Sequence, residues 1–211
     1  MRIFKEVSLA DSFSVLNALL GFSAIICAVK DLERSFTFFY FSLIADGLDG
    51  WIASKTEKGK LGKELDSLAD AISFSLYPAF IVFLKDPNLF AFSSLLLAFS
   101  ILRLARFNVL SLRDFLGIPT SISAILVTSL VRINASSEII AILIIIFSIL
   151  MISDINYRRV QGIKLVPLGI LTLLAIPFLE VCYILIVLSL IYAIHPGVFL
   201  CGRLLQHLRR E

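Results

Sequence analysis

Charged residues are scarce in this 211-residue chain, at 17% of the sequence against 59% for hydrophobic residues. The mean hydropathy is +0.96. A soluble domain usually carries about a quarter charged residues, so this chain has too little polar surface to cover a water-soluble globule. The composition therefore excludes a soluble enzyme, a secreted domain and a disordered protein, and it is typical of helical membrane proteins.

Cysteine is also rare, with Cys27, Cys182 and Cys201 lying far apart in or beside apolar runs. An odd and dispersed set does not indicate a disulfide framework or a zinc site, so we expect reduced packing residues. Strict alternation of apolar and polar residues is missing, which excludes a β-barrel. Internal repeats are not evident either, which disfavours the inverted halves of many secondary transporters.

The continuous apolar runs predict an all-α, polytopic membrane protein with about eight transmembrane helices. A helix needs roughly 20 predominantly apolar residues to cross a bilayer. The predicted spans are Phe13–Val29, Phe36–Ala53, Leu65–Leu84, Leu89–Leu110, Ile118–Val131, Ile139–Ile152, Leu165–Leu179 and Val181–Leu200. Only Glu180 separates the last two spans.

The distribution of positive charge predicts the orientation of these spans. If the N-terminus is cytoplasmic, 15 of the 19 Lys and Arg residues fall in cytoplasmic segments and 4 in outer turns. Cytoplasmic loops of membrane proteins carry such an excess. We therefore expect a multi-pass protein of the cell membrane with both termini in the cytoplasm.

Four aspartates interrupt the second and third predicted spans near the cytoplasmic side. Asp46 and Asp49 are three residues apart, and Asp66 and Asp70 are four apart, so each pair shares one helix face. Acids in a membrane span cost a few kcal/mol each. The alternative is that these aspartates cap helix ends exposed to water. This would explain one of the four more easily than all four. Ligand sets made only of oxygen favour Mg²⁺, Mn²⁺ or Ca²⁺, so the pattern predicts a divalent-metal site.

These residues resemble the signature of the CDP-alcohol phosphatidyltransferases, D-x-x-D-G-x-x-A-R followed by G-x-x-x-D-x-x-x-D. The matching positions, within residues 46–70, are Asp46, Asp49, Gly50, Ala53, Gly62, Asp66 and Asp70. Two features depart from the signature. Ser54 replaces its arginine, with Lys55 as the neighbouring cation, and the gap before Gly62 is one residue shorter than usual.

Further stretches resemble the serine-using members of the family, namely residues 66–74, 102–109, 115–119 and 150–153. The resemblance spans roughly residues 9–160, and we expect residues 1–211 to form a single membrane domain. It implies transfer of a phosphatidyl or archaetidyl group from a CDP-linked lipid to the hydroxyl of L-serine, with release of CMP. It also implies a homodimer in the lipid bilayer that binds no nucleic acid.

The resemblance assigns roles to individual residues as well. It implies two Mg²⁺ or Mn²⁺ ions held by Asp46, Asp49, Asp66 and Asp70, with Asp70 also acting as the general base. The residues expected to bind the nucleotide and CDP-lipid are Asp11, Ser14, Asn17, Gly50, Ala53, Ser54, Lys55 and Gly62.

Arg103, Arg106 and Asn108 are the predicted serine-binding residues. Arginine grips carboxylates with two parallel hydrogen bonds, and an asparagine could receive the serine ammonium group. The alternative for the two arginines is snorkelling to lipid head groups.

Two other functions fit the pattern of intramembrane acids. One is the same chemistry with another acceptor, such as glycerol phosphate or inositol phosphate, which would require more cations around the site. The other is a divalent-cation or proton-coupled transporter, because such acids also mark ion paths. Clustering of the acids at one membrane face favours the enzyme.

Overall fold

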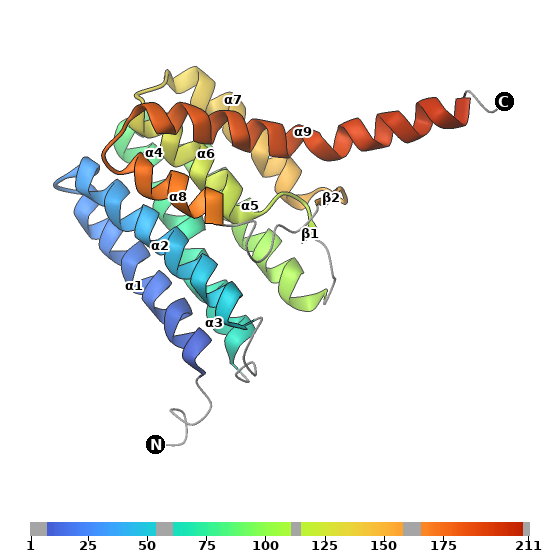
Figure 1. Ribbon diagram of the computed structural model, residues 1–211. Helices are drawn as coiled ribbons and strands as arrows, with labels where there is room; N and C mark the ends of the chain where they lie inside the picture. The colour runs from blue at the N-terminus through green and yellow to red at the C-terminus, as the bar shows by residue number, and fades with distance from the viewer. Residues whose placement is uncertain (1–7, 54–60, 111–114, 158–165, 209–211) are drawn as a thin grey trace.

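The computed structural model of the protein describes residues 8–53, 61–110, 115–157 and 166–208. These residues are helical apart from one two-stranded ribbon, which confirms the predicted all-α class (Figure 1). The long helical elements are α1 (Leu9–Ala28), α2 (Leu32–Ala53), α3 (Gly62–Asp70), α4 (Tyr77–Lys85), α5 (Phe90–Val109), α6 (Thr120–Arg132), α7 (Ser137–Ile152), α8 (Val166–Ala175) and α9 (Glu180–Leu208). The shorter elements are the π-helix η2 (Ala71–Leu76), the 3₁₀-helix η3 (Pro87–Leu89), and the strands β1 (Phe115–Leu116) and β2 (Asn156–Tyr157).

Helices α1 and α2 form a hairpin, and α3 packs against α1 beside them (Figure 1). A capping box starts α1: the Asp11 backbone N–H donates to Ser8 Oγ at 3.2 Å, and the Ser8 backbone N–H donates to Asp11 Oδ2 at 2.7 Å. These reciprocal bonds satisfy two groups that would otherwise lack partners at the start of the helix. The hairpin and α3 hold all four aspartates of the signature.

The third predicted span is a continuous helical run, Gly62–Lys85, but its middle is π-helical. The π-helical segment begins at Ala71, directly after Asp70. Such segments are rare, they insert an extra residue per turn, and they occur frequently at functional sites. The insertion sets the rotation between the acidic start of this run and its aromatic second half.

Aromatic side chains fill the core behind the acidic residues. Phe39 stacks on Tyr77 with ring centroids 5.1 Å apart, and it meets Phe74 edge-on at 6.3 Å. All three are fully buried, as is Tyr40. This packing joins α2 to the run that follows α3 and fixes the spacing of the two acid-bearing helices.

The ribbon joins the segment after α5 to the segment after α7. Its strands are antiparallel, with Phe115 opposite Tyr157 and Leu116 opposite Asn156. Gly117 has a φ of +75° and donates its N–H to the Ile155 carbonyl at 2.9 Å. A β-carbon at Gly117 would also clash with the Met151 carbonyl. The turn therefore requires glycine both for its positive φ and for this close contact.

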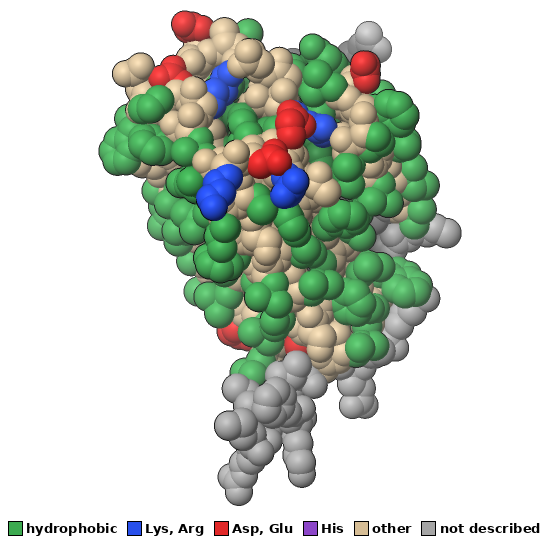
Figure 2. Space-filling view, turned by 90° about the vertical axis from the view of Figure 1, so that its left-hand side faces the viewer, with side chains coloured by type: hydrophobic (Ala, Val, Ile, Leu, Met, Phe, Trp, Pro, Cys, Tyr) green, Lys and Arg blue, Asp and Glu red, His purple; other side chains and the backbone are tan. Residues whose placement is uncertain are grey.

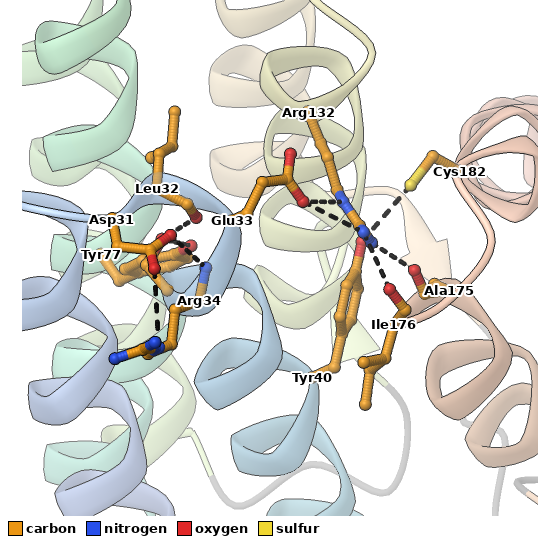
Figure 3. A network of polar contacts seen from close by, with 11 residues as sticks. Asp31, Leu32, Glu33, Arg34, Tyr40, Tyr77, Arg132, Ala175, Ile176 and Cys182 are labelled. Atoms are coloured by element: carbon orange, nitrogen blue, oxygen red, sulfur yellow. Dashed lines mark hydrogen bonds and ion pairs between the residues drawn. The ribbon is translucent and has the colours of Figure 1, made fainter.

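Arg132 connects three helices in the polar network of Figure 3, which lies at the start of α2, whereas Asp46 and Asp49 lie near its end. Its guanidinium pairs with Glu33 of α2 at 3.3 Å and donates to the carbonyls of Ala175, the last residue of α8, and of Ile176, which follows it. It also lies over the Tyr40 ring, 5.7 Å from its centroid. Because the Arg132 side chain is only 7% exposed, these contacts hold a nearly buried charge.

Among the residues that the structure describes, three helices are long and apolar enough to cross a membrane: Leu9–Ala28, Gly62–Lys85 and Pro87–Val109. Shorter apolar helices cover Thr120–Arg132, Ser137–Ile152, Val166–Ala175 and Glu180–His195. In Figure 2, one face of the molecule is largely hydrophobic, with charged side chains gathered toward its upper part. These features fit a membrane protein, whereas the count of eight spans stays a prediction. Helix α9 begins at Glu180, where the sequence predicts the last boundary.

Candidate active site

Three aspartates from two helices form an acidic cluster. Asp46 of α2 and Asp66 and Asp70 of α3 each offer a carboxylate oxygen, and these three oxygens lie within 4.8 Å of one another. All three residues are partly buried. Carboxylates this close repel one another, and a divalent cation bound by their oxygens would relieve the repulsion. The predicted convergence of the two acid-bearing helices is therefore present.

The fourth aspartate of the signature turns toward α1. Asp49 is 8% exposed, and its carboxylate accepts a hydrogen bond from the Ser14 hydroxyl. It is not one of the three cluster residues. The structure thus separates the four predicted ligands into a cluster of three and a neighbour that Ser14 holds.

Two glycines leave open space beside the acids on α2. Within the described part of the chain, a β-carbon at Gly47 or Gly50 would meet no atom of another segment within 4 Å. Gly62 differs, because a β-carbon there would lie 2.7 Å from Oδ1 of Asp11. The predicted site glycines therefore have two roles: Gly50 keeps a surface open, and Gly62 allows α1 to approach the start of α3.

One face of α1 supplies polar side chains to both acid-bearing helices. Ser14 bonds to Asp49, and one turn later Asn17 donates from Nδ2 to Oδ1 of Asp70 at 3.4 Å. Asp11, another predicted substrate residue, is 2% exposed and belongs to the helix cap. The structure brings Ser14 and Asn17 to the aspartates and gives Asp11 a local structural role.

Helix α5 approaches the acidic cluster through Arg103, which is 5% exposed. Its guanidinium lies over the Phe107 ring, 5.5 Å from the centroid, and it attracts the Asp70 carboxylate electrostatically. A buried cation therefore lies within electrostatic range of Asp70, where an anionic substrate group could share it.

Asn108 is held by two residues of α3 that the sequence analysis did not assign to the site. Ser67 donates its hydroxyl to Asn108 Oδ1 at 2.8 Å, and Lys63 Nζ donates to the Asn108 carbonyl at 2.6 Å. The sequence feature that points to Ser67 as a site residue is its position between Asp66 and Asp70. Oδ1 of Asn108 already accepts a hydrogen bond from Ser67. The amide NH₂ group of Asn108 is therefore the group that can donate hydrogen bonds to a substrate.

Arg106 points to another part of the molecule. Its guanidinium donates to the Ile152 carbonyl at 3.0 Å and to the Ser153 carbonyl at 3.3 Å, and it pairs with Asp154. These groups lie at and beyond the end of α7, so Arg106 joins α5 to the segment after α7. Its role in binding serine stays a prediction.

The remaining predicted residues follow Gly50 along α2. Ala53 is the last residue of the helix and is partly buried. Ser54 and Lys55, which stand where the signature has its arginine, lie outside the described residues.

Comparison with known proteins agrees with this arrangement. A family model described as CDP-alcohol phosphatidyltransferase matches residues 7–195. The CDP-diacylglycerol–serine O-phosphatidyltransferase of Methanocaldococcus jannaschii is 34% identical over 196 residues, which cover 92% of this chain and 94% of the relative. The archaetidylserine synthase of Methanothermobacter thermautotrophicus is 35% identical over 173 residues, covering 76% and 74% of the two chains. The Helicobacter pylori (strain 26695) CDP-diacylglycerol–serine O-phosphatidyltransferase is 32% identical over 188 residues, covering 78% and 79%. The chain belongs to the CDP-alcohol phosphatidyltransferase family.

Proposed function

We propose that this protein transfers a phosphatidyl or archaetidyl group from a CDP-linked lipid to the hydroxyl of L-serine and releases CMP. The observation that carries the proposal is the convergence of Asp46, Asp66 and Asp70 in one cluster, with the signature glycines beside it. The names of the relatives support serine as the acceptor.

The acidic cluster is suited to divalent ions, because its donors are all carboxylate oxygens and lie within 4.8 Å of one another. We propose that Asp46, Asp66 and Asp70 hold Mg²⁺ or Mn²⁺, with Asp49 contributing to a second ion. Bound there, the ions would offset the charge of the pyrophosphate and of the departing CMP.

Asp70 is the proposed general base. The serine hydroxyl gives its proton to the Asp70 carboxylate as its oxygen attacks the phosphorus that carries the lipid. The bond between this phosphorus and the CMP oxygen breaks, so the lipid phosphate gains serine and loses CMP. Positioning and electrostatics supply most of the acceleration in phosphoryl transfer, so a carboxylate base suffices.

The surface beside Gly47 and Gly50 is the proposed place for the pyrophosphate and nucleotide. Without side chains at these positions, a bulky polyanion can approach the backbone of α2 closely. Ser54 and Lys55 are proposed to contact the same phosphates, with Lys55 in place of the arginine of the family signature.

Arg103 is the proposed partner of an anionic substrate group, either the serine carboxylate or a phosphate. It is buried, and it lies near Asp70, where the serine hydroxyl must react. A guanidinium can bind a carboxylate through two parallel hydrogen bonds. The amide NH₂ group of Asn108 could add a third donor to the same anion.

The proposal includes the setting of the enzyme. We propose a single membrane domain of eight spans, with both termini and the active site at the cytoplasmic face. This orientation rests on the excess of Lys and Arg in the predicted cytoplasmic segments. A homodimer is part of the proposal on the basis of the family resemblance.

The decisive experiment supplies the purified protein with CDP-diacylglycerol or CDP-archaeol and Mn²⁺. L-serine, glycerol phosphate and inositol phosphate, each labelled, are offered separately, while CMP release and label in the lipid are followed. Label should enter the lipid from serine alone and in step with CMP. Incorporation of another acceptor would refute serine specificity. Metal flux in proteoliposomes without CMP release would favour a transporter.

A further inference from the structure

Helix α1 makes an unusually close contact with the π-helical segment that follows Asp70. A β-carbon at Gly21 would lie 2.8 Å from the Cα and Cβ atoms of Ser73. The Ser73 hydroxyl donates to the backbone carbonyl of Asn17 at 2.9 Å. These contacts hold the α1 backbone around Asn17 against the helix that carries Asp70.

The Asn17 side chain is buried at this contact, and only its amide nitrogen forms a hydrogen bond among the described residues. It is 1% exposed, and its Nδ2 donates to Oδ1 of Asp70 at 3.4 Å. A carboxylate oxygen can only accept, so the amide nitrogen must face it. Within the part of the chain that the structure describes, no donor reaches Oδ1 of Asn17.

A buried acceptor without a donor lowers stability, so packing alone does not favour asparagine at this position. Leucine has the same number of side-chain heavy atoms and would bury no polar atom. What asparagine adds is a donor directed at one specific carboxylate oxygen of the acidic cluster.

We propose that Asn17 is a positioning residue for Asp70. Its amide holds one oxygen of the Asp70 carboxylate, which fixes the rotation of the group toward Asp46, Asp66 and the reacting serine hydroxyl. The role of Asp70 as the base rests on the proposed function, whereas its orientation by Asn17 does not. This role differs from nucleotide binding, which the family resemblance implies for Asn17.

The test compares Asn17→Leu with Asn156→Leu, the same change at an exposed position of β2. Loss of a partner behind a metal ligand typically costs about 10- to 100-fold in activity or metal affinity. We expect Asn17→Leu to lower kcat by about 10- to 100-fold, with the KM values for CDP-lipid and serine changing by no more than about threefold. Asn156→Leu should change none of these quantities.

Two further readouts keep the result interpretable. Mn²⁺ affinity, measured by electron paramagnetic resonance without substrate, should fall by at least about tenfold in Asn17→Leu. This measurement holds even if the wild-type protein uses an acceptor other than serine, a result that would refute only the proposed function. In an Asp70→Asn background, Asn17→Leu should lower residual turnover no further, because the two side chains act as one unit.

Other outcomes would overturn the assignment. A large rise in the KM for CDP-lipid with unchanged kcat would make Asn17 a nucleotide ligand. A lower thermal midpoint with normal turnover per folded molecule and unchanged Mn²⁺ affinity would make it a packing residue. If Asn17→Leu does not fold, Asn17→Ala is measured in the same way, and normal kcat and Mn²⁺ affinity in that variant would contradict the proposal.

Discussion

The hydroxyl of Ser67 donates a hydrogen bond to Oδ1 of Asn108 at 2.8 Å, which links the acidic face of α3 to the end of α5. Lys63 supports the same connection through the Asn108 carbonyl. The pair therefore holds the proposed acceptor side of the site against the aspartates.

Removing the hydrogen bond from Ser67 to Asn108 should weaken the connection between α3 and the proposed serine-binding end of α5. We expect Ser67→Ala to lower the free energy of unfolding by about 1 kcal/mol and to raise the KM for serine more than that for CDP-lipid. Steady-state kinetics and thermal unfolding in detergent measure both effects. The control is Ser23→Ala, because the Ser23 hydroxyl donates to the Leu19 carbonyl of its own helix. Equal KM changes for the two substrates would argue against this role of Ser67.

Gly50→Ala should separate stability from substrate binding. A β-carbon at Gly50 meets no atom of another described segment within 4 Å, so alanine should stabilise the helix by about 0.5–1 kcal/mol. If the pyrophosphate approaches this backbone, the KM for CDP-lipid should nevertheless rise. Gly169→Ala is the matched control, because that position is equally open but belongs to α8. An unchanged KM in Gly50→Ala would place the pyrophosphate elsewhere.

The acidic cluster predicts two different inactive variants. We expect Asp66→Asn and Asp70→Asn each to lower kcat by at least about 100-fold. Asp66→Asn should also weaken Mn²⁺-dependent CMP binding, whereas Asp70→Asn should retain much of its CDP-lipid binding. Titration calorimetry separates the two. Glu64→Gln, an exposed acid on the same helix, should remain active. Near-normal turnover in Asp70→Asn would exclude it as the base.

The two arginines of α5 should respond differently to lysine. Arg103→Lys keeps the charge but loses the paired hydrogen bonds, so the KM for serine should rise by about tenfold or more. Arg106→Lys should mainly lower the thermal midpoint, because Arg106 contacts the carbonyls of Ile152 and Ser153. A larger serine KM effect in Arg106→Lys than in Arg103→Lys would reverse this assignment.

Arg132→Lys should destabilise the protein without affecting catalysis. A lysine there cannot reach Glu33 and the two carbonyls at the end of α8 together, so we expect the free energy of unfolding to fall by about 1.5–3 kcal/mol. The kcat per folded molecule should be unchanged, since this contact lies at the start of α2, whereas Asp46 and Asp49 lie near its end. Arg34→Lys, an exposed partner of Asp31, serves as the control. A change in kcat at constant stability would contradict the structural role.

Helix periodicity was enough to pair the aspartates from the sequence. Residues three or four apart share a helix face whatever surrounds the helix, and a short loop brings the two acid-bearing helices together. The same local reasoning located the apolar runs and the helix boundary at Glu180. The length of an apolar run and the charges that interrupt it can both be read directly from the sequence.

How these faces meet follows from packing between helices that are distant in the sequence. Asp49 turns to Ser14, and Arg103 and Arg106 diverge although they are three residues apart. Such outcomes depend on the rotation of each helix against its neighbours. For α1, the close contact of Gly21 with Ser73 in the π-helical segment after Asp70 limits that rotation. Periodicity along one helix carries no information about that rotation, because it results from packing between segments distant in sequence.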